Sequence, residues 1–297
     1  MRHLTAVLGL GAVLFLSGCA DSKWSIFRHQ QDSGQFLARQ QPPTADQLVA
    51  YLNRNASQIH SLVCSNVDLD CKQGIHQFHI RSKLACQKPR NFRMMADVIG
   101  KTEADIGSND YEFWYWIKKG DPYLIHCSYQ DLEKGVRIPF PFQPECVMEA
   151  LGMAQYDPGQ YEMVPRDRTY QLVQNTRNSQ GQPVRKVTVF NAQNGRVTDH
   201  ILMDSTGRQE ICRAHIEEPQ EIRQGVWLPR RIVFTYPAES LTLKMTLWHR
   251  ADEVTLDAQF DAQQASTLFS RPALQGVPAY DLAHPESSNA VQRAGSY

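Results

Sequence analysis

The sequence lacks an excess of charge of either sign, and this excludes one broad class of function. Its 297 residues contain 31 Lys and Arg and 31 Asp and Glu, so the formal charge at pH 7 is zero. Proteins that bind nucleic acids normally carry a clear basic excess, because the phosphate backbone dominates their affinity. We therefore expect no nucleic-acid partner.

Long apolar runs are also lacking. The one extended apolar stretch, Leu4–Leu16, is shorter than the roughly 20 residues that a membrane-spanning helix needs. This excludes a multi-pass membrane protein. Hydrophobic residues make up 42% of the chain and charged residues 21%, which is typical of a globular protein with enough chain for a sizeable core.

The motifs of common enzyme classes are missing as well. The chain contains no Gly-x-Ser-x-Gly elbow, no His-Glu-x-x-His, no P-loop and no dinucleotide fingerprint. Asp68 and Asp70 are candidates for paired carboxylates, but they stand beside a predicted turn, and a solvated loop is the simpler interpretation. We expect no enzyme and no cofactor. A hydrolase whose triad is assembled only in space is the least favoured alternative.

The N-terminus has the three parts of a secretion signal. A basic start, Met1–His3, precedes the apolar stretch, which ends in Leu16-Ser17-Gly18-Cys19. These four residues resemble a lipobox, the cleavage and lipidation site of bacterial lipoproteins. The resemblance implies that residues 1–18 are a lipoprotein signal peptide. It also implies that Cys19 becomes the new N-terminus and carries a diacylglyceryl thioether and an N-acyl chain.

The residue after the cysteine bears on location. In the enterobacterial sorting rule, an Asp at this position retains a lipoprotein in the inner membrane, and this chain has Ala20. We therefore expect an outer-membrane lipoprotein facing the periplasm and held in the membrane by its acyl chains, such as palmitate. Two or three acyl chains, at about 0.8 kcal/mol per buried CH₂, anchor a protein stably. Residues 19–43 are polar and Gln-rich, and they are predicted to form the lipidated N-terminus and a flexible tether.

Six cysteines remain beyond Cys19, and their state is open at this point. In an exported chain they form up to three disulfides or stay as buried thiols. Cys64 and Cys71 are close enough in sequence to pair across a turn. With His76 and His79 they also suggest a metal site, but the spacing matches no familiar zinc motif, and we expect none. The six are Cys64, Cys71, Cys86, Cys127, Cys146 and Cys212.

The hydrophobic period divides the chain into a helix followed by strands. Thr44 and Gln47 form a capping-box pattern, which predicts a helix over residues 44–61 with a polar break at Asn55. From Phe78 to His249 the period is two, which predicts an antiparallel meander of nine to eleven strands. A second helix is predicted over residues 144–153, and Asn194-Gly195 predicts a hairpin.

These patterns predict one main domain, residues 44–271, of the mainly-β α+β class. Residues 272–297 are polar and rich in Pro and Ser, and they are predicted to be a disordered tail. A long antiparallel sheet of this kind curls or closes to protect its edges.

Four segments resemble LolA/LolB-like lipoprotein carriers, and the likeness extends over residues 44–271. Lys88–Met94 is similar to the family's basic-Pro-x-x-Phe strand start. Ser108–Trp116 is similar to its turn followed by a Trp-rich strand. Asn194-Gly195 and Leu228–Ile232 are similar to elements of its second half.

The resemblance implies a half-closed antiparallel β-barrel covered by helices, with an apolar cavity that holds acyl chains of lipids or lipoproteins and performs no catalysis. Where the family often has an Arg that contacts the helical lid, this chain has Lys88, for which the same lid contact is expected. The lipobox favours an anchored acceptor or lipid carrier over a soluble shuttle. We expect a monomer.

Large apolar residues on the predicted strands are the candidates for the binding cavity. They are Phe92, Met94, Trp114, Trp116, Trp227, Phe234 and Met245. Trp114 and Trp116 share one face of a strand that is apolar on both sides, so either both faces are covered or one lines a cavity. The alternative function is a structural or protein-interaction lipoprotein with a filled core. An open apolar cavity of several hundred Å³ under the helices would separate the two.

Overall fold

The computed structural model describes residues 42–99, 101–118, 122–138, 143–178 and 180–286. The predicted signal peptide, Cys19 and all of the tether before residue 42 lie outside these ranges. No helix in the described residues has the length and apolar character that a membrane crossing requires.

The described residues contain short helices and many strands. The α-helices are α2 (Ala45–Ala56), α3 (Tyr129–Glu133), α4 (Pro144–Ala150) and α5 (Ala262–Leu268). The strands are β1 (Ser61–Gln73), β2 (His76–Gln87), β3 (Asn91–Val98), β4 (Lys101–Ser108), β5 (Glu112–Ile117), β6 (Leu124–Ser128), β7 (Glu162–Pro165), β8 (Thr169–Arg177), β9 (Pro183–Asn191), β10 (Val197–Asp204), β11 (Glu210–Arg223), β12 (Val226–Tyr236), β13 (Leu241–Thr246), β14 (Val254–Leu256) and β15 (Ala279–Asp281).

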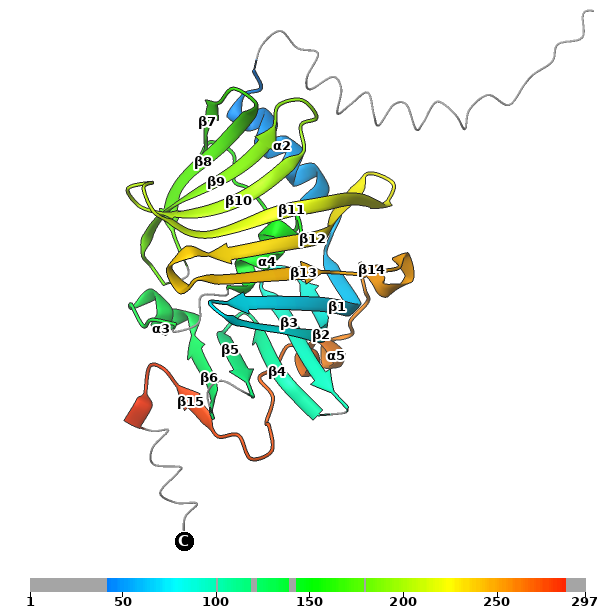
Figure 1. The fold of residues 1–297 in the computed structure, drawn as a ribbon, viewed down its shortest axis with the longest axis vertical. Coiled ribbons are helices and arrows are strands. Elements are labelled where there is room, and N and C mark those ends of the chain that lie inside the picture. The colour runs from blue at the N-terminus through cyan, green and yellow to red at the C-terminus, as the bar shows by residue number, and fades with distance from the viewer. Residues whose placement is uncertain (1–41, 100, 119–121, 139–142, 179, 287–297) are drawn as a thin grey trace, which may run out of the picture.

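All fifteen strands belong to one curled sheet (Figure 1). Its order is β15-β6-β5-β4-β3-β2-β1-β13-β12-β11-β10-β9-β8-β7, and β14 pairs with β1. Two meanders, β1–β6 and β7–β13, are therefore joined where β1 pairs antiparallel with β13. The sheet does not close on itself, because β15 and β7 remain as its two edges. The predicted class, a mainly-β α+β fold with a half-open barrel, is confirmed.

The first helix begins where the sequence predicts and ends earlier. The Thr44 hydroxyl accepts a hydrogen bond from Gln47 N (3.2 Å), and the Gln47 side chain accepts one from Thr44 N (3.1 Å), so the capping box is confirmed. The helix ends at Ala56, and Leu62, which fits the helical spacing, lies on β1. Leu62 satisfies both periods, and its pairing with Cys86 of β2 and Leu256 of β14 decides between them.

Assigning residues 61–73 to β1 corrects the interpretation of Asp68 and Asp70 as part of a solvated loop. Asp68 and Asp70 lie on a strand, and their carboxylates contact histidines of neighbouring strands and loops. His249 Nε2 is 2.6 Å from Asp68, and His79 Nδ1 is 2.8 Å from Asp70. Within the described residues, no group of three or more His, Cys, Asp or Glu side chains is arranged to hold a metal ion.

The six cysteines within the domain are free thiols. Cys64 and Cys71 lie on the same strand, so they do not pair across a turn. Seven residues of extended chain, at about 3.3 Å each, separate their Cα atoms by more than about 20 Å. A disulfide needs Cα atoms less than about 7 Å apart.

Several elements fall outside the sequence prediction. Helices α3 and α5 are too short to show a period, and β4 carries charged residues that hide its alternation. β15 lies within the segment predicted to be a disordered tail, and it pairs in parallel with β6. That prediction is wrong for residues 279–281, while residues 287–297 lie outside the described part.

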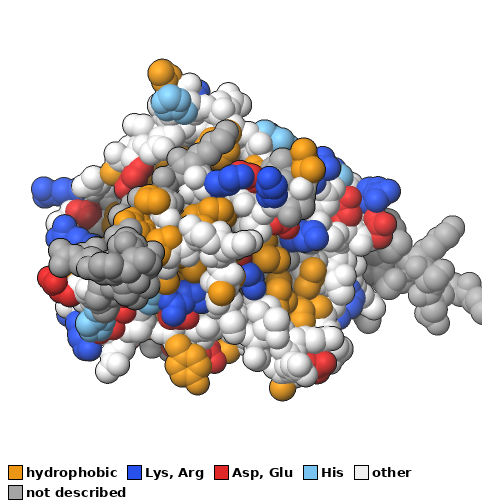
Figure 2. Space-filling model, turned by 90° about the horizontal axis from the view of Figure 1, so that it is seen from below, with side chains coloured by type: hydrophobic (Ala, Val, Ile, Leu, Met, Phe, Trp, Pro, Cys, Tyr) orange, Lys and Arg blue, Asp and Glu red, His pale blue; other side chains and the backbone are white. Residues whose placement is uncertain are grey.

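Charges of both signs are interspersed on the surface. On the face shown in Figure 2, Lys and Arg side chains and Asp and Glu side chains both occur, and apolar side chains appear between them. This distribution agrees with the zero formal charge of the chain.

Candidate functional site

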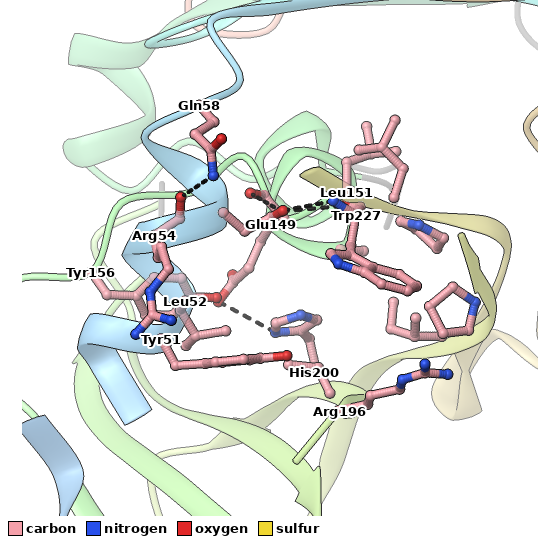
Figure 3. Close-up of a pocket in the computed structure, with 18 of the residues that line it drawn as sticks. Tyr51, Leu52, Arg54, Gln58, Glu149, Leu151, Tyr156, Arg196, His200 and Trp227 are labelled. Carbon is pink, nitrogen blue, oxygen red and sulfur yellow. Dashed lines mark hydrogen bonds and ion pairs between the residues drawn. The ribbon is translucent and has the colours of Figure 1, made fainter. Parts of the chain in front are cut away.

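A cavity of about 750 Å³ lies between α2, the end of α4 and strands β10–β12 (Figure 3). Sites for small molecules typically have volumes of about 300–1,000 Å³ and mostly apolar walls. An open cavity of this size is the feature that distinguishes an acyl-binding protein from an interaction protein with a filled core. Its apolar and aromatic lining consists of Ala50, Tyr51, Leu52, Ala150, Leu151, Tyr156, Val197, Ile216, Pro219, Trp227, Leu228 and Pro229.

Helix α2 covers the cavity because its two sides differ. On one side, Leu48 and Val49 are buried in a cluster with Leu172 of β8 and Phe190 of β9. Leu52 belongs to the same cluster and also borders the cavity. The polar and small side chains of the next face, which include Ala50 and Asn55, line the cavity. Burial of the apolar stripe thus fixes which side of the helix faces the cavity.

Asn55 attaches α2 to the opposite wall. Its Nδ2 donates a hydrogen bond to the backbone oxygen of Trp227 (3.1 Å), and its Oδ1 accepts one from the Trp227 N–H (2.9 Å). Nδ2 also reaches Gly152 O at 3.4 Å. Gly152 has φ +73°, and a Cβ at that position would lie 2.8 Å from the Asn55 amide, so this close approach requires glycine.

Two further amides attach the same helix. Asn53 exchanges hydrogen bonds with the backbone of Tyr156, donating to its oxygen at 2.8 Å and accepting from its N–H at 2.9 Å. Gln58, just beyond the helix, donates to Gly225 O at 3.3 Å in the β11–β12 turn. These hydrogen bonds to backbone groups add to the apolar packing that holds the helix over the cavity.

Lys88 closes the C-terminal end of α2. Its ammonium group donates a hydrogen bond to Ala56 O, one of the last carbonyls of the helix. A cation at this position compensates the partial negative charge of a helix C-terminus. Partial burial lowers the pKa of Lys88, and the nearby Asp257 opposes this effect. Lys88 therefore contacts the helix that covers the cavity.

A buried ion pair lies at the inner wall of the cavity. Glu149 lies 2.9 Å from Lys186 Nζ and accepts a hydrogen bond from the Tyr156 hydroxyl at 3.3 Å. Burial raises the pKa of Glu149, but the charge of Lys186 and the hydrogen bonds from Lys186 and Tyr156 oppose this, and the pKa is lowered overall. Burial also lowers the pKa of His200, although Glu149, 3.8 Å away, acts in the opposite direction. The inner wall therefore holds a compensated acid and an uncharged imidazole at neutral pH.

The outer part of the cavity carries positive charge. The Arg196 guanidinium lies 5.1 Å from the centre of the Trp227 ring, which is a cation–π contact. Trp227 itself is 37% exposed. Burial raises the pKa of Tyr51, and both Arg196 and Arg54 counteract that shift. Tyr51, Arg54 and Arg196 therefore lie within electrostatic range of one another.

Of the seven predicted ligand-binding residues, Trp227 lines this cavity and the other six do not. Phe92, Met94, Phe234 and Met245 are buried in the main core, each at most 5% exposed. The face of the sheet on which these four residues lie is filled by side chains.

Trp114 and Trp116 share one face, and it lies on the other side of β5. They pack with Leu124 and with Leu274 and Val277 of the C-terminal segment. The indole of Trp114 donates a hydrogen bond to Asp105 (2.9 Å), which is paired with Arg93 (2.8 Å). These two residues cover a second core and do not reach the cavity.

Sequence reasoning missed most of the polar groups of the site. Asn55 was visible as the break in an apolar helix face, which is the signal of a polar contact at that position. Arg54, Glu149, Arg196 and His200 belong to no motif, because the topology brings them together from α2, α4 and the β9–β10 hairpin.

Comparison with known proteins identifies the fold. No protein-family model matches the sequence, and no curated protein matches it. A domain described as an outer membrane lipoprotein-sorting protein from Vibrio parahaemolyticus is similar in structure. It has a TM-score of 0.52 and 8% identity, and the match covers 76% of this chain and 100% of that one. A LolA superfamily protein from Nitrosomonas europaea has a TM-score of 0.50 and 14% identity, with 77% and 98% covered. The chain therefore has a LolA-like fold.

Proposed function

We propose that this protein is an envelope lipoprotein that binds the acyl chains of lipids or lipoproteins in the cavity beneath α2. The observation that carries the proposal is the cavity of about 750 Å³, walled mainly by apolar side chains and covered by a helix. The LolA-like fold and the lipoprotein-sorting description of one structural neighbour support the same assignment.

The energy of burial is sufficient for useful affinity. At about 0.8 kcal/mol per CH₂, burying ten methylenes contributes roughly 8 kcal/mol before costs. Ordering of the chain and of the protein offsets part of this gain. Acyl chains with more than ten methylenes make up for this cost of ordering. A Kd near 1 μM corresponds to a binding free energy of about 8 kcal/mol. We therefore expect micromolar binding of long-chain amphiphiles.

The remaining parts of the proposal come from the N-terminus and the fold. Cys19 carries the lipid anchor, and the domain works at the outer membrane on its periplasmic side. The protein acts as a monomeric carrier or acceptor in lipid or lipoprotein transport, without catalysis. The cavity disfavours the alternative of an interaction protein with a filled core.

Native mass spectrometry with palmitate tests the proposal. The full chain with Cys19→Ser is used, so that the protein carries no acyl chain of its own. Ile216 lines the cavity from β11, and Ile211 on the same strand is 37% exposed and does not line it. We expect Ile216→Glu to weaken palmitate binding at least about tenfold, because the buried carboxylate is costly beside an alkyl chain.

Ile211→Glu is the matched control and should bind palmitate like the parent protein. Circular dichroism checks that both variants are folded. If the parent protein binds no palmitate at saturating concentration, or if both substitutions weaken binding equally, the cavity is not the acyl site.

A further inference from the structure

We propose that Arg54 and Arg196 form a recognition site for an anionic head group at the mouth of the cavity. The ligand is then an acyl amphiphile whose head group carries a phosphate or a carboxylate. This inference rests on the proposed function, since it assigns the polar end of a molecule whose acyl chain fills the cavity.

The charge balance of the lining is the first observation. Glu149 is the one carboxylate among the residues that line the cavity, and Lys186 binds it at 2.9 Å. Within the described ranges, neither Arg54 nor Arg196 makes an ion pair with an Asp or Glu side chain, in contrast to Lys186. The two arginines therefore leave the site with uncompensated positive charge.

The position of the arginines is the second observation. Both are exposed, while Glu149 and His200 lie deeper in the wall. Arg54 is in the last turn of α2, and Arg196 directly precedes β10. Figure 3 shows Tyr51 between them, with its hydroxyl directed into the cavity. This is where the polar end of a molecule whose tail points inward reaches water.

The state of each group suits the binding of an anion. The Trp227 ring holds the Arg196 guanidinium by a cation–π contact, which limits the freedom lost on binding. A guanidinium presents two parallel N–H groups that match a carboxylate or a phosphate. Burial raises the pKa of Tyr51 further above its ordinary value, so its hydroxyl stays protonated at neutral pH and adds no negative charge at the mouth.

The interior of the cavity favours the acyl tail of the ligand over its anionic head group. His200 is uncharged at neutral pH because burial lowers its pKa, and Glu149 is compensated by Lys186. The cavity therefore changes from cationic at the mouth to apolar inside. This gradient orients an amphiphile with its tail inward and its acidic group at the arginines.

Binding of paired amphiphiles to the Cys19→Ser chain tests the inference. The probes are 1-palmitoyl lysophosphatidylglycerol, which is anionic, 1-palmitoyl lysophosphatidylcholine, which has no net charge, and palmitate. We expect Arg54→Gln with Arg196→Gln to weaken lysophosphatidylglycerol and palmitate about tenfold, and lysophosphatidylcholine less than about threefold. Arg168→Gln, an exposed arginine outside the cavity, is the control and should change none of them.

Salt provides a second readout that needs no variant. Raising NaCl from about 0.05 M to 0.5 M should weaken the anionic probes and leave the uncharged one unchanged, because exposed charges are screened. If the double variant binds only one of the two anionic probes more weakly, that result identifies whether the arginines bind a phosphate or a carboxylate.

The outcomes separate this inference from the proposed function. Equal binding of charged and uncharged probes, with no effect of the double substitution, overturns the head-group site and leaves the acyl site standing. Failure of all three probes to bind overturns both.

Discussion

Asn55 occupies a position where the helical pattern calls for an apolar residue. The side-chain amide of Asn55 forms hydrogen bonds with the N–H and the C=O of Trp227, as the backbone of a neighbouring strand would. Both bonds require a side chain of this length with a donor and an acceptor. This explains why position 55 holds an amide side chain, since an apolar residue such as leucine would form neither bond. A polar residue within an apolar stripe thus marks the point where α2 is attached to β12.

Replacing this amide should loosen the cover of the cavity. Asn55→Ala leaves the Trp227 N–H and C=O without these partners, and we expect the free energy of unfolding to fall by about 1–3 kcal/mol. Asn55→Asp keeps the acceptor but loses the donor, so its loss should be intermediate. Urea denaturation measures both changes.

Gln77→Ala, which removes an exposed amide on β2, is the control and should stay within about 0.5 kcal/mol of the parent protein. A fully stable Asn55→Ala variant would show that packing alone holds α2.

At the scale of elements, β5 shows how a strand with two apolar faces is accommodated. Phe113 and Tyr115 pack into the main core, and Trp114 and Trp116 pack on the other side. The sequence left two alternatives open for this strand, and the first holds: both faces of β5 are covered. The cover on the second face comes from Leu274 and Val277, which precede β15.

The C-terminal segment should therefore contribute to stability. Removing residues 272–297 deletes β15 and exposes Trp114 and Trp116, and we expect a loss of about 2–4 kcal/mol from the lost apolar burial. Tryptophan emission of the native protein should also shift to longer wavelength. Urea denaturation followed by fluorescence measures both effects.

Removing residues 287–297 is the matched control, since these lie outside the described residues and β15 is retained. The role assigned to the segment is wrong if the longer truncation unfolds at the same urea concentration as the control.

At the scale of the whole molecule, one continuous sheet encloses the cysteines. Five of the six thiols are buried, and Cys146 is partly buried. Burial raises the pKa of Cys64 and of Cys212 to about 12, and that of Cys127 to about 11, where the acidic groups nearby add to the effect. Since the thiolate is the reactive form, these thiols should react slowly in the folded protein.

Alkylation followed by mass spectrometry tests this arrangement. The Cys19→Ser chain, unfolded in urea without reductant, should take up six iodoacetamide groups. The native protein at pH 8 should react far more slowly. Four or fewer modified cysteines in urea would instead reveal a disulfide.

Local sequence determined much of the element order. The capping box of α2, the proline that begins α4, and the β9–β10 hairpin all lie where their residues predict. These features depend on contacts within a few residues, so the sequence alone is sufficient to predict them. The hairpin loop is longer than a two-residue turn, spanning residues 192–196, and Gly195 adopts φ +67° within it.

Only the tertiary structure decided which apolar faces surround a cavity and which are filled. Alternation shows that Trp114 and Trp227 each lie on a defined face of a strand, but it does not show what covers that face. The C-terminal segment covers Trp114, while α2 lies over Trp227 and leaves space beneath. Contacts between segments more than a hundred residues apart make this difference, and a periodic pattern within one strand carries no information about them.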